Sequence, residues 1–454
     1  MAKTRLVLLL MALTLAACRG LPVTSFPTMP PTASPEPVPR ESHTPFPTFP
    51  PTPLGVQWVR VTATPFLTST QVSPAEPNLA TPTATLFKTP TPSATPGPPI
   101  RHLPLDTEVT LTEIQMINSN EGWGIGGIPG RDAHLLRTSD AGETWRDVSP
   151  PVPRPEPGKN LAAAGSFLDS QSARVVFYVP LPERGNVQTL VVWHTDDGGA
   201  TWAASRAADL YFIGVPSLQP LVRFVDLDHG WILIRYGGIG MHKHPVALLA
   251  TVDGGETWHV KMDYGSSALF SCTKSGVAFG DPLVGFATIA DCPIDGIETD
   301  WTYDGGLTWL GRMTPLPQDH LDNVGECDAH SPQFVSASLA FAAADCTPYA
   351  SPETVAFLFS TRDAGASWEI RRYPGGTLLF IDENTGWALG RDIYQTTDSG
   401  LHWERVKTVT WDGQFSFVSP SEGWAVARSD GEVALVRTLD GGTTWALLEP
   451  VIGR

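Results

Sequence analysis

The chain has 454 residues and carries 47 Asp and Glu against 30 Lys and Arg, for a formal net charge of -17. This acidic balance argues against nucleic acid and anionic lipid surfaces as ligands, because both favour basic patches. About half of the 43 prolines lie in the first 104 residues. The change in composition predicts a proline-rich N-terminal segment followed by a longer folded region.

The first 17 residues have the order of a signal peptide, with Lys3 and Arg5 followed by an apolar run over 6–15 and small residues before Cys18. The run is shorter than the roughly 20 residues that a membrane span needs. Residues 15–18, Leu-Ala-Ala-Cys, resemble the bacterial lipobox. That resemblance implies cleavage before Cys18, lipid modification of this cysteine and an extracytoplasmic, membrane-anchored protein. An ordinary signal peptide with an incidental cysteine is the alternative.

Residues 18–104 are rich in Pro and Thr, most clearly at 44–53 and 81–98. Frequent Pro removes backbone donors and fixes φ, and few large apolar residues offset the entropy of ordering. We therefore predict a disordered, extended linker that acts as a stalk. A binding site for proline-recognising domains is the alternative.

The pattern Thr-x-Asp-x-Gly-x-Thr-Trp recurs seven times after the linker, at steps of 35 to 59 residues. Its aspartates are Asp140, Asp197, Asp253, Asp304, Asp363, Asp398 and Asp440. Ser367 and His402 replace the second Thr in two copies. Each copy predicts a turn whose Asp accepts backbone N–H groups, whose Gly adopts positive φ and whose Trp packs against a neighbour. We call these the aspartate turns and predict a structural role for them.

A second repeated element, Gly followed by Trp or Phe, precedes most aspartate turns inside an apolar run. Its copies are Gly122-Trp123, Gly230-Trp231, Gly285-Phe286, Gly386-Trp387 and Gly423-Trp424. The second and fifth units lack the pair but keep strand-like runs at 173–179 and 339–344. Together the two elements resemble the Asp-box, or BNR, repeat of sialidases and sortilin-type receptors. Their combined spacing resembles the photosystem II stability/assembly factor-like propellers over about residues 105–454.

These repeats predict an all-β domain over 105–454, a seven-bladed β-propeller with four-stranded antiparallel blades, preceded by the disordered Pro/Thr-rich stalk. The expected blades cover residues 107–149, 161–206, 219–262, 268–313, 330–372, 375–407 and 413–450. How the ring closes stays open. Residues 101–106 are a candidate outer strand for the last blade.

Four cysteines remain after Cys18, which allow three disulfide connectivities. We favour Cys272–Cys292 and Cys327–Cys346, because each pair brackets the second strand of its blade at a similar distance. A metal site is the competing interpretation. It is disfavoured because the chain has no Cys-x-x-Cys pair and because thiolates oxidise outside the cell.

No catalytic set is recognisable in the sequence. The sialidase resemblance implies an arginine triad, a Tyr–Glu pair and an Arg-Ile-Pro-like motif, and the nearest local match is the Pro-Arg-Pro at 153–155. Arg223 and Arg235 flank a pair of strands, and we expect them to form outward salt bridges. Other arginines are scattered, among them Arg174, Arg371, Arg372, Arg391 and Arg428.

Xyloglucanase-type propellers imply a pair of catalytic carboxylates. The pairs to consider are Asp226 with Asp228 and Asp295 with Asp300. Loop turns explain such pairs equally well. His242 and His244 form the one metal-like local pattern, without an identifiable third ligand. We therefore assign no catalytic, cofactor or metal residues.

The function we favour from the sequence is a lipid-anchored scaffold or assembly-factor-like module that holds a protein partner. The alternative is a surface glycoside hydrolase or a carbohydrate-binding propeller. Trp301 and Trp411 lie outside both repeated elements, so they are candidates for exposed sugar-binding rings, although burial between blades competes with that role.

Overall fold

The computed structural model describes residues 98–154, 159–180, 188–210, 219–237, 244–263, 272–290, 296–316, 324–348 and 353–454. The chain divides into two compact units, Met1–Phe87 and Lys88–Arg454, and all described residues belong to the second. The predicted signal peptide, Cys18 and nearly all of the predicted stalk lie outside the described residues. Within the described ranges no helix is long and apolar enough to cross a membrane.

The first three blades are built from the following strands. Blade 1 comprises β1 (Thr110–Met116), β2 (Gly122–Gly127), β3 (His134–Thr138) and β4 (Thr144–Asp147). Blade 2 comprises β5 (Ala162–Phe167), β6 (Ala173–Tyr178), β8 (Val192–Thr195) and β9 (Ala203–Ala204), and beside it β7 (Gln188–Leu190) pairs with β10 (Ala208–Leu210). Blade 3 comprises β11 (Leu221–Phe224), β12 (Gly230–Arg235), β13 (Val246–Thr251) and β14 (His259–Met262).

The remaining blades follow the same order. Blade 4 comprises β15 (Thr273–Phe279), β16 (Gly285–Ala290), β17 (Gly296–Thr302) and β18 (Leu310–Pro315). Blade 5 comprises β19 (Val324–Ala329), β21 (Ala340–Pro348), β22 (Val355–Thr361) and β23 (Glu369–Arg372), with β20 (Gln333–Phe334) added to β21. Blade 6 comprises β24 (Thr377–Phe380), β25 (Gly386–Leu389), β26 (Asp392–Thr396) and β27 (Glu404–Thr408). Blade 7 comprises β28 (Asp412–Phe417), β29 (Gly423–Ser429), β30 (Glu432–Thr438) and β31 (Ala446–Leu448).

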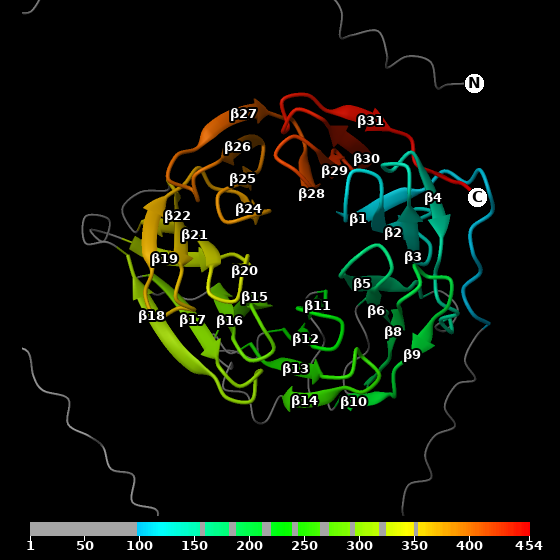
Figure 1. The fold of residues 1–454 in the computed structure, drawn as a ribbon, viewed down its shortest axis with the longest axis horizontal. Coiled ribbons are helices and arrows are strands. Elements are labelled where there is room, and N and C mark those ends of the chain that lie inside the picture. Colours follow the sequence, from blue (N-terminus) through cyan, green and yellow to red (C-terminus); the bar gives the residue numbers. More distant parts are fainter. Residues whose placement is uncertain are drawn as a thin grey trace, which may run out of the picture. The chain divides into compact units, whose positions relative to one another are not determined.

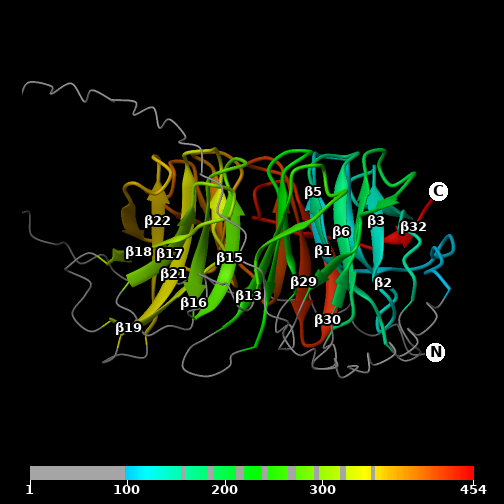
Figure 2. The same ribbon diagram turned by 90° about the horizontal axis from the view of Figure 1, so that it is seen from below.

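The predicted all-β, seven-bladed propeller is confirmed. Each blade is an antiparallel meander whose last strand lies at the rim of the ring (Figure 1). The strand nearest the centre is the first strand of the blade, except in blade 5, where the short strand β20 takes this place (Figure 1). The strands run between the two ends of the ring (Figure 2). We call the end that holds the first-to-second and third-to-fourth strand connections the turn face. The opposite end, with the second-to-third and blade-to-blade connections, is the loop face.

The aspartate turns are closed by the same hydrogen bonds in every blade. In blade 1, Asp140 Oδ1 accepts the Thr144 N–H at 2.9 Å, and Asp140 Oδ2 accepts the Thr144 hydroxyl at 2.7 Å. Thr138 Oγ1 accepts the N–H of Gly142, whose φ is 92°. The two altered copies keep the second contact: the Ser367 hydroxyl donates to its aspartate at 2.6 Å. His402 Nδ1 lies 2.7 Å from its own aspartate.

A second capped turn, not expected from the sequence, joins the first two strands of each blade, and in blade 5 it joins β20 to β21. The side-chain oxygen of the capping residue accepts a hydrogen bond from a backbone N–H two or three residues later in the sequence. The capping residues are Asn118, Asp169, Asp226, Asp281, Ser336, Asp382 and Ser419. Each of these turns also holds the aspartate turn of its blade, as where Ala141 N donates to Asn120 O at 2.8 Å. On the turn face, each blade therefore has the same two turns, which are joined by a backbone hydrogen bond.

We expect the ring to lose stability in acid through the aspartate turns. Hydrogen bonds from the side chain and backbone of Thr201, and then from Thr195, lower the pKa of Asp197 to about 2. Bonds from the backbone and side chain of His402 lower the pKa of Asp398 to about 2. The unfolded value is near 4, so this stabilisation is complete above about pH 4 and is lost as the pH falls towards 2.

The measurement is the melting temperature across this pH range for the wild type and for Asp440→Asn. The variant loses the Thr444 hydroxyl bond to Asp440 Oδ2, which costs about 1 kcal/mol at neutral pH, and its acid-induced fall is correspondingly smaller. Glu404→Gln, at an exposed carboxylate outside the turns, is the control. A fall as steep in Asp440→Asn as in the wild type would contradict the prediction.

The Gly-Trp and Gly-Phe pairs join neighbouring blades. Trp231 of blade 3 stacks on Phe279 of blade 4, with ring centroids 3.6 Å apart and planes 4° apart. Its Nε1 donates to Gly305 O in the blade 4 aspartate turn at 3.0 Å. Phe279 also covers Gly285 of its own blade, where a Cβ atom would collide with the ring. The absence of a side chain at Gly285 thus leaves space for Phe279, whose ring stacks on Trp231 of the preceding blade.

Blade 2 uses Arg174 at the position where blades 1, 3, 6 and 7 have Trp. The side chain is 2 % exposed, and its Nε donates to Gly254 O at 2.6 Å, the place that corresponds to Gly305 in the next blade. The guanidinium lies 5.7 Å from the centre of the Phe224 ring, so a cation–π contact replaces the stacked pair. Blade 2 therefore keeps the inter-blade contact although it lacks the sequence signal.

The C-terminal strand closes the ring. β32 (Val451–Ile452) pairs in parallel with β4 of blade 1, as the outermost strand of that sheet (Figure 2). Residues 101–106 do not extend the last blade. They lie along blade 1, where Leu103 N donates to Asp147 Oδ2 at 2.8 Å and Asp106 N donates to Ile452 O at 2.8 Å. On the channel side, Gln414 of blade 7 bonds both the N–H and the carbonyl of Ile114.

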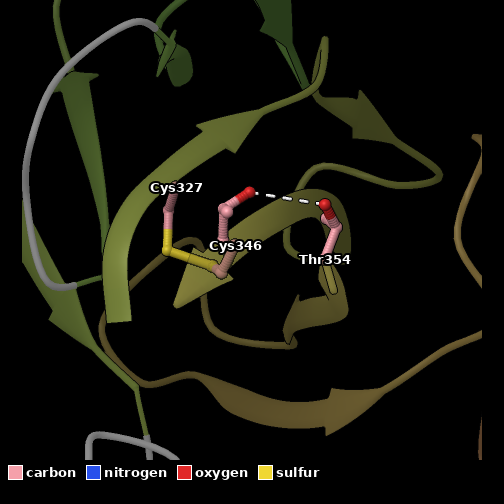
Figure 3. The surroundings of a disulfide bond; sticks show 4 residues. Cys327, Cys346 and Thr354 are labelled. Atoms are coloured by element: carbon pink, nitrogen blue, oxygen red, sulfur yellow. Dashed lines mark hydrogen bonds between the residues drawn. A yellow bond between two sulfur atoms is a disulfide. The ribbon is translucent and has the colours of Figure 1, made fainter. Parts of the chain in front are cut away.

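The Cys327–Cys346 disulfide is confirmed (Figure 3). The two cysteines face each other on β19 and β21, in the first and second strands of blade 5. Cys272 is disulfide-bonded as well, while its predicted partner Cys292 lies outside the described residues.

Candidate binding site

A cavity of about 700 Å³ opens on the loop face beside the central channel. We call this region the channel mouth. Its walls come from the β2–β3 connection, the start of β5, the end of β6, the segment before β11 and the β29–β30 connection. The polar side chains that line it include Thr112, Glu113, Asn160, Tyr178, Gln219 and Arg428. Blades 1, 2, 3 and 7 therefore contribute to one site.

Glu113 reaches the channel mouth through an irregularity in β1. The pairing with β2 shifts between Leu111 and Glu113, so Thr112 is an extra residue on the inner strand. Such a bulge redirects the side chains that follow it. Burial in the channel wall raises the pKa of Glu113, whereas Arg223, a hydrogen bond from Gln219 and Arg428 oppose the rise.

Arginines surround this carboxylate. Arg223 is exposed on the innermost strand β11, donates to Val222 O at 3.0 Å, and lies close enough to Glu113 for each to shift the pKa of the other. Arg428 donates from Nη2 to Thr112 O, on the strand that carries Glu113. The predicted outward salt bridge of Arg223 is therefore wrong, because its strand lines the channel rather than the rim.

Arg235 donates to backbone carbonyl groups of its own blade and of the next one. Its Nη1 donates to Ser275 O at 3.1 Å and its Nη2 to Gln219 O at 3.1 Å. Burial, and then the charge of Arg223, lower its pKa. Arg235 thus fixes the backbone of Gln219, whose amide reaches Glu113 Oε2 at 3.4 Å.

Tyr178 supplies a phenol at the end of β6. It is half-buried, and burial together with the charge of Glu113 raises its pKa. The phenol therefore stays protonated and can donate a hydrogen bond. The channel mouth combines a carboxyl group, guanidinium groups, an amide and an aromatic ring.

Of the carboxylate pairs considered from sequence, Asp226 and Asp228 are the pair that lies wholly within the described residues. Asp226 Oδ1 accepts the N–H groups of Asp228 and His229, which makes this pair a turn on the turn face. Asp300 is buried inside blade 4, and Asp295 lies outside the described residues.

Three further candidates from the sequence, Arg154, Trp301 and Trp411, do not line the cavity themselves. Arg154 Nε lies 3.0 Å from Oδ2 of Asp132, a carboxylate that lines the cavity. Trp301 is 0 % exposed, so a role as an open sugar platform is wrong for this residue. Trp411 packs on Phe415 and Trp445.

No group of three or more His, Cys, Asp or Glu side chains is placed to hold a metal ion among the described residues. His242 lies outside them, and His244 is half-buried ahead of β13.

Sequence reasoning missed Glu113, Tyr178 and Gln219 as site residues. The only available signal was a charged residue inside an otherwise apolar inner strand, in Leu-Thr-Glu-Ile-Gln-Met at 111–116. Partners from four blades become neighbours only when the ring is assembled.

Neither a known protein family nor a curated protein sequence matches this chain. A GH74 enzyme from Niastella koreensis is 13% identical over 74% of this chain and 62% of that one, less than two thirds of its length, with a TM-score of 0.32. A PL25 ulvan lyase is 12% identical over 78% of this chain and 98% of that one, with a TM-score of 0.45. The α-L-arabinofuranosidase Arb93A from Fusarium graminearum is 12% identical over 63% and 93% of the two chains, with a TM-score of 0.40. At these identities, ligand and reaction have to be argued from the site.

Proposed function

We propose that the protein is an extracytoplasmic propeller, anchored by lipid at Cys18 and raised on its Pro/Thr-rich stalk, that binds acidic polysaccharide at the channel mouth. The observation that carries this proposal is a cavity of about 700 Å³ lined by Glu113, Tyr178 and Arg428, with Arg223 close to Glu113. The aspartate turns and Gly-Trp pairs support placing the ring among Asp-box propellers, and the lipobox-like residues support the anchor.

The shape of the site favours a sugar over a protein partner. A concave pocket with a few convergent polar groups encloses a small ligand, whereas a stable protein interface buries roughly 800 Å² on each side. A cavity of about 700 Å³ has room for a short stretch of a sugar chain, and its opening lets the chain continue outward.

The chemistry of the site favours a sugar that carries a carboxylate. Arginine binds carboxylates through parallel N–H···O bonds. Arg223 and Arg428 each donate one hydrogen bond to a backbone carbonyl group, and each guanidinium has five N–H donors. Glu113, with its raised pKa, and the Tyr178 phenol suit sugar hydroxyls. In a chain of net charge -17, recognition of an acid depends on these short-range bonds.

A protein partner on the turn face is the second candidate. Blades 3 and 4 expose several apolar side chains there. These are Leu227, Val252, Leu283, Tyr303 and Leu307. Exposed apolar side chains gathered on one face are typical of interaction surfaces. This observation favours the scaffold hypothesis, and a partner bound there would leave the channel mouth free.

The test is calorimetric titration with oligogalacturonate and, in parallel, with a neutral oligosaccharide of equal length. We expect the acidic ligand to bind and Arg223→Ala to weaken it at least about tenfold, which corresponds to about 1.4 kcal/mol. Glu113→Gln should retain binding, because the amide still offers a donor and an acceptor. If the oligosaccharide is shortened during the incubation, the protein also cleaves the sugar that it binds.

Arg405→Ala is the matched control, since this arginine is exposed on the outer strand of blade 6. It should bind like the wild type. Equal weakening by both arginine variants, or no preference for the acidic sugar, would overturn the proposal. Capture of a protein partner that is lost in Leu227→Ser with Leu283→Ser would favour the second candidate.

A further inference from the structure

Blade 4 encloses a lysine and a carboxyl group away from the channel mouth. Lys274 on the inner strand β15 is 0 % exposed, and the Asp300 side chain on β17 is 8 % exposed. Lys274 Nζ lies 3.7 Å from Asp300 Oδ2. The two strands are not paired with each other, because β16 lies between them.

Strand register places Asp300 on the side of the sheet that packs against blade 3. Asp300 stands opposite Ala287, which stands opposite Val277. Ala287 and Val277 belong to one apolar cluster with Trp231 and Leu248 of blade 3. Lys274 stands opposite Ile289, two residues along β16 from Ala287, and therefore on the same side.

An ion pair is expensive in these surroundings, because each charge loses its hydration. Burial lowers the pKa of Lys274, although the charges of Asp300 and Glu298 oppose this. Burial raises the pKa of Asp300 to about 6, against the effect of Lys274 and with that of Glu298. Both shifts weaken the charged forms, so the neutral amine and the neutral carboxylic acid are reached more easily than in water.

A second carboxylate accompanies the pair. Glu298 precedes Asp300 by two residues on β17, so both side chains project from the same side of the strand. Gly311 of β18 stands opposite Asp300, and a Cβ atom there would lie 3.3 Å from Asp300 Oδ1 and 3.3 Å from Glu298 Oε1. The glycine leaves space in which the two carboxyl groups gather.

We propose that Lys274 and Asp300 join in an isopeptide bond that links β15 to β17 across β16. The neutral Nζ attacks the Asp300 Cγ, the Nζ–Cγ bond forms, the Cγ–OH bond breaks, and one water molecule leaves. Glu298 takes the proton from the attacking nitrogen and returns it to the departing hydroxyl. No oxidant or cofactor is needed, and the fixed proximity of the two groups replaces chemical activation.

The crosslink would replace the buried charges by an uncharged amide and would fasten the inner strand to the third strand of the blade. It would complement the disulfide that joins β19 to β21 in blade 5. The inference is independent of the proposed ligand, since neither residue lines the cavity.

The test is mass spectrometry of the mature wild-type chain after reduction. We expect residues 262–312 to resist trypsin at Lys274, the one Lys or Arg inside that segment before Arg312, and to be lighter than the linear sequence by one water molecule. Two separate peptides, 262–274 and 275–312, at their sequence masses would overturn the proposal and leave a buried ion pair. This readout needs only the wild type, so it does not depend on how variants fold.

Variants sharpen the chemistry. Asp300→Asn should still crosslink but lose ammonia instead of water, which changes the mass deficit by a known amount. Lys274→Met should abolish the deficit, and Glu298→Gln should leave mostly linear chain. Lys407→Met, at an exposed lysine on β27, should keep the wild-type deficit. A deficit that persists in Lys274→Met would contradict the assignment.

Discussion

Arg174→Ala is expected to lower the free energy of unfolding by about 3 kcal/mol or more. This is the largest effect that we expect from a substitution of one buried side chain in the ring. The buried guanidinium donates to Gly254 O in blade 3 at 2.6 Å and to Thr195 O in its own blade at 2.9 Å. Removing it leaves both carbonyl groups buried without these donors and opens a void beneath Phe224. The ion pair with Asp196 contributes little, because that carboxylate is exposed.

Arg174→Trp tests the reason for this loss. Tryptophan fills the equivalent place in blades 3, 6 and 7, where Nε1 bonds to the aspartate turn of the next blade. The substitution keeps the Gly254 bond and the ring contact but loses the Thr195 bond, so we expect a cost of about 1 kcal/mol. Thermal and urea unfolding of both variants measure the difference. Arg391→Ala, at an exposed arginine, is the control, and a loss in Arg174→Ala no larger than in this control would refute the argument.

The parts of the fold that could be predicted are those whose physics is local. An aspartate turn closes through hydrogen bonds between residues two to four positions apart, as from Thr138 to Asp140 and from Thr144 to Asp140. The turn can therefore be predicted from the residues of the repeated pattern without knowledge of the rest of the fold. Gly285 is also explained locally, because a Cβ atom at this position would collide with the ring of Phe279 in the same blade. Seven local units of this kind were enough to predict the ring.

Features that depend on the assembled ring could not be predicted. Arg174 is read as an ordinary surface charge until Phe224 and Gly254 of the next blade surround it. Glu113 and Arg428 are more than 300 residues apart and become neighbours only because blade 7 packs on blade 1. The sequence left two roles open for Trp301, and the assembled ring decides between them, because Trp301 is buried in a cluster with Phe357 and Phe359 of blade 5.

Under the proposed sugar-binding function, the turn face holds the repeated structural turns and the loop face holds the ligand. The turn face repeats the same pair of capped turns in each blade, which leaves little freedom for variation there. The long steps between the early aspartate turns place their additional residues in loop-face connections, where the channel mouth lies. Binding groups on loops held by a rigid scaffold are the common arrangement in proteins.

Removal of residues 450–454 is expected to destabilise the ring by about 3 to 5 kcal/mol, because it opens the closure between the first and last blades. Ile452 is 3 % exposed within the cluster that joins Trp145 of blade 1 to Trp424 of blade 7. The deletion also removes the pairing with β4 and the bond from Val109 N to Pro450 O. The unpaired edge of β4 would then favour self-association, which light scattering detects alongside the melting temperature. Deletion of Arg454 alone, an exposed residue, is the control; equal melting of the two truncated chains would mean that the ring closes without β32.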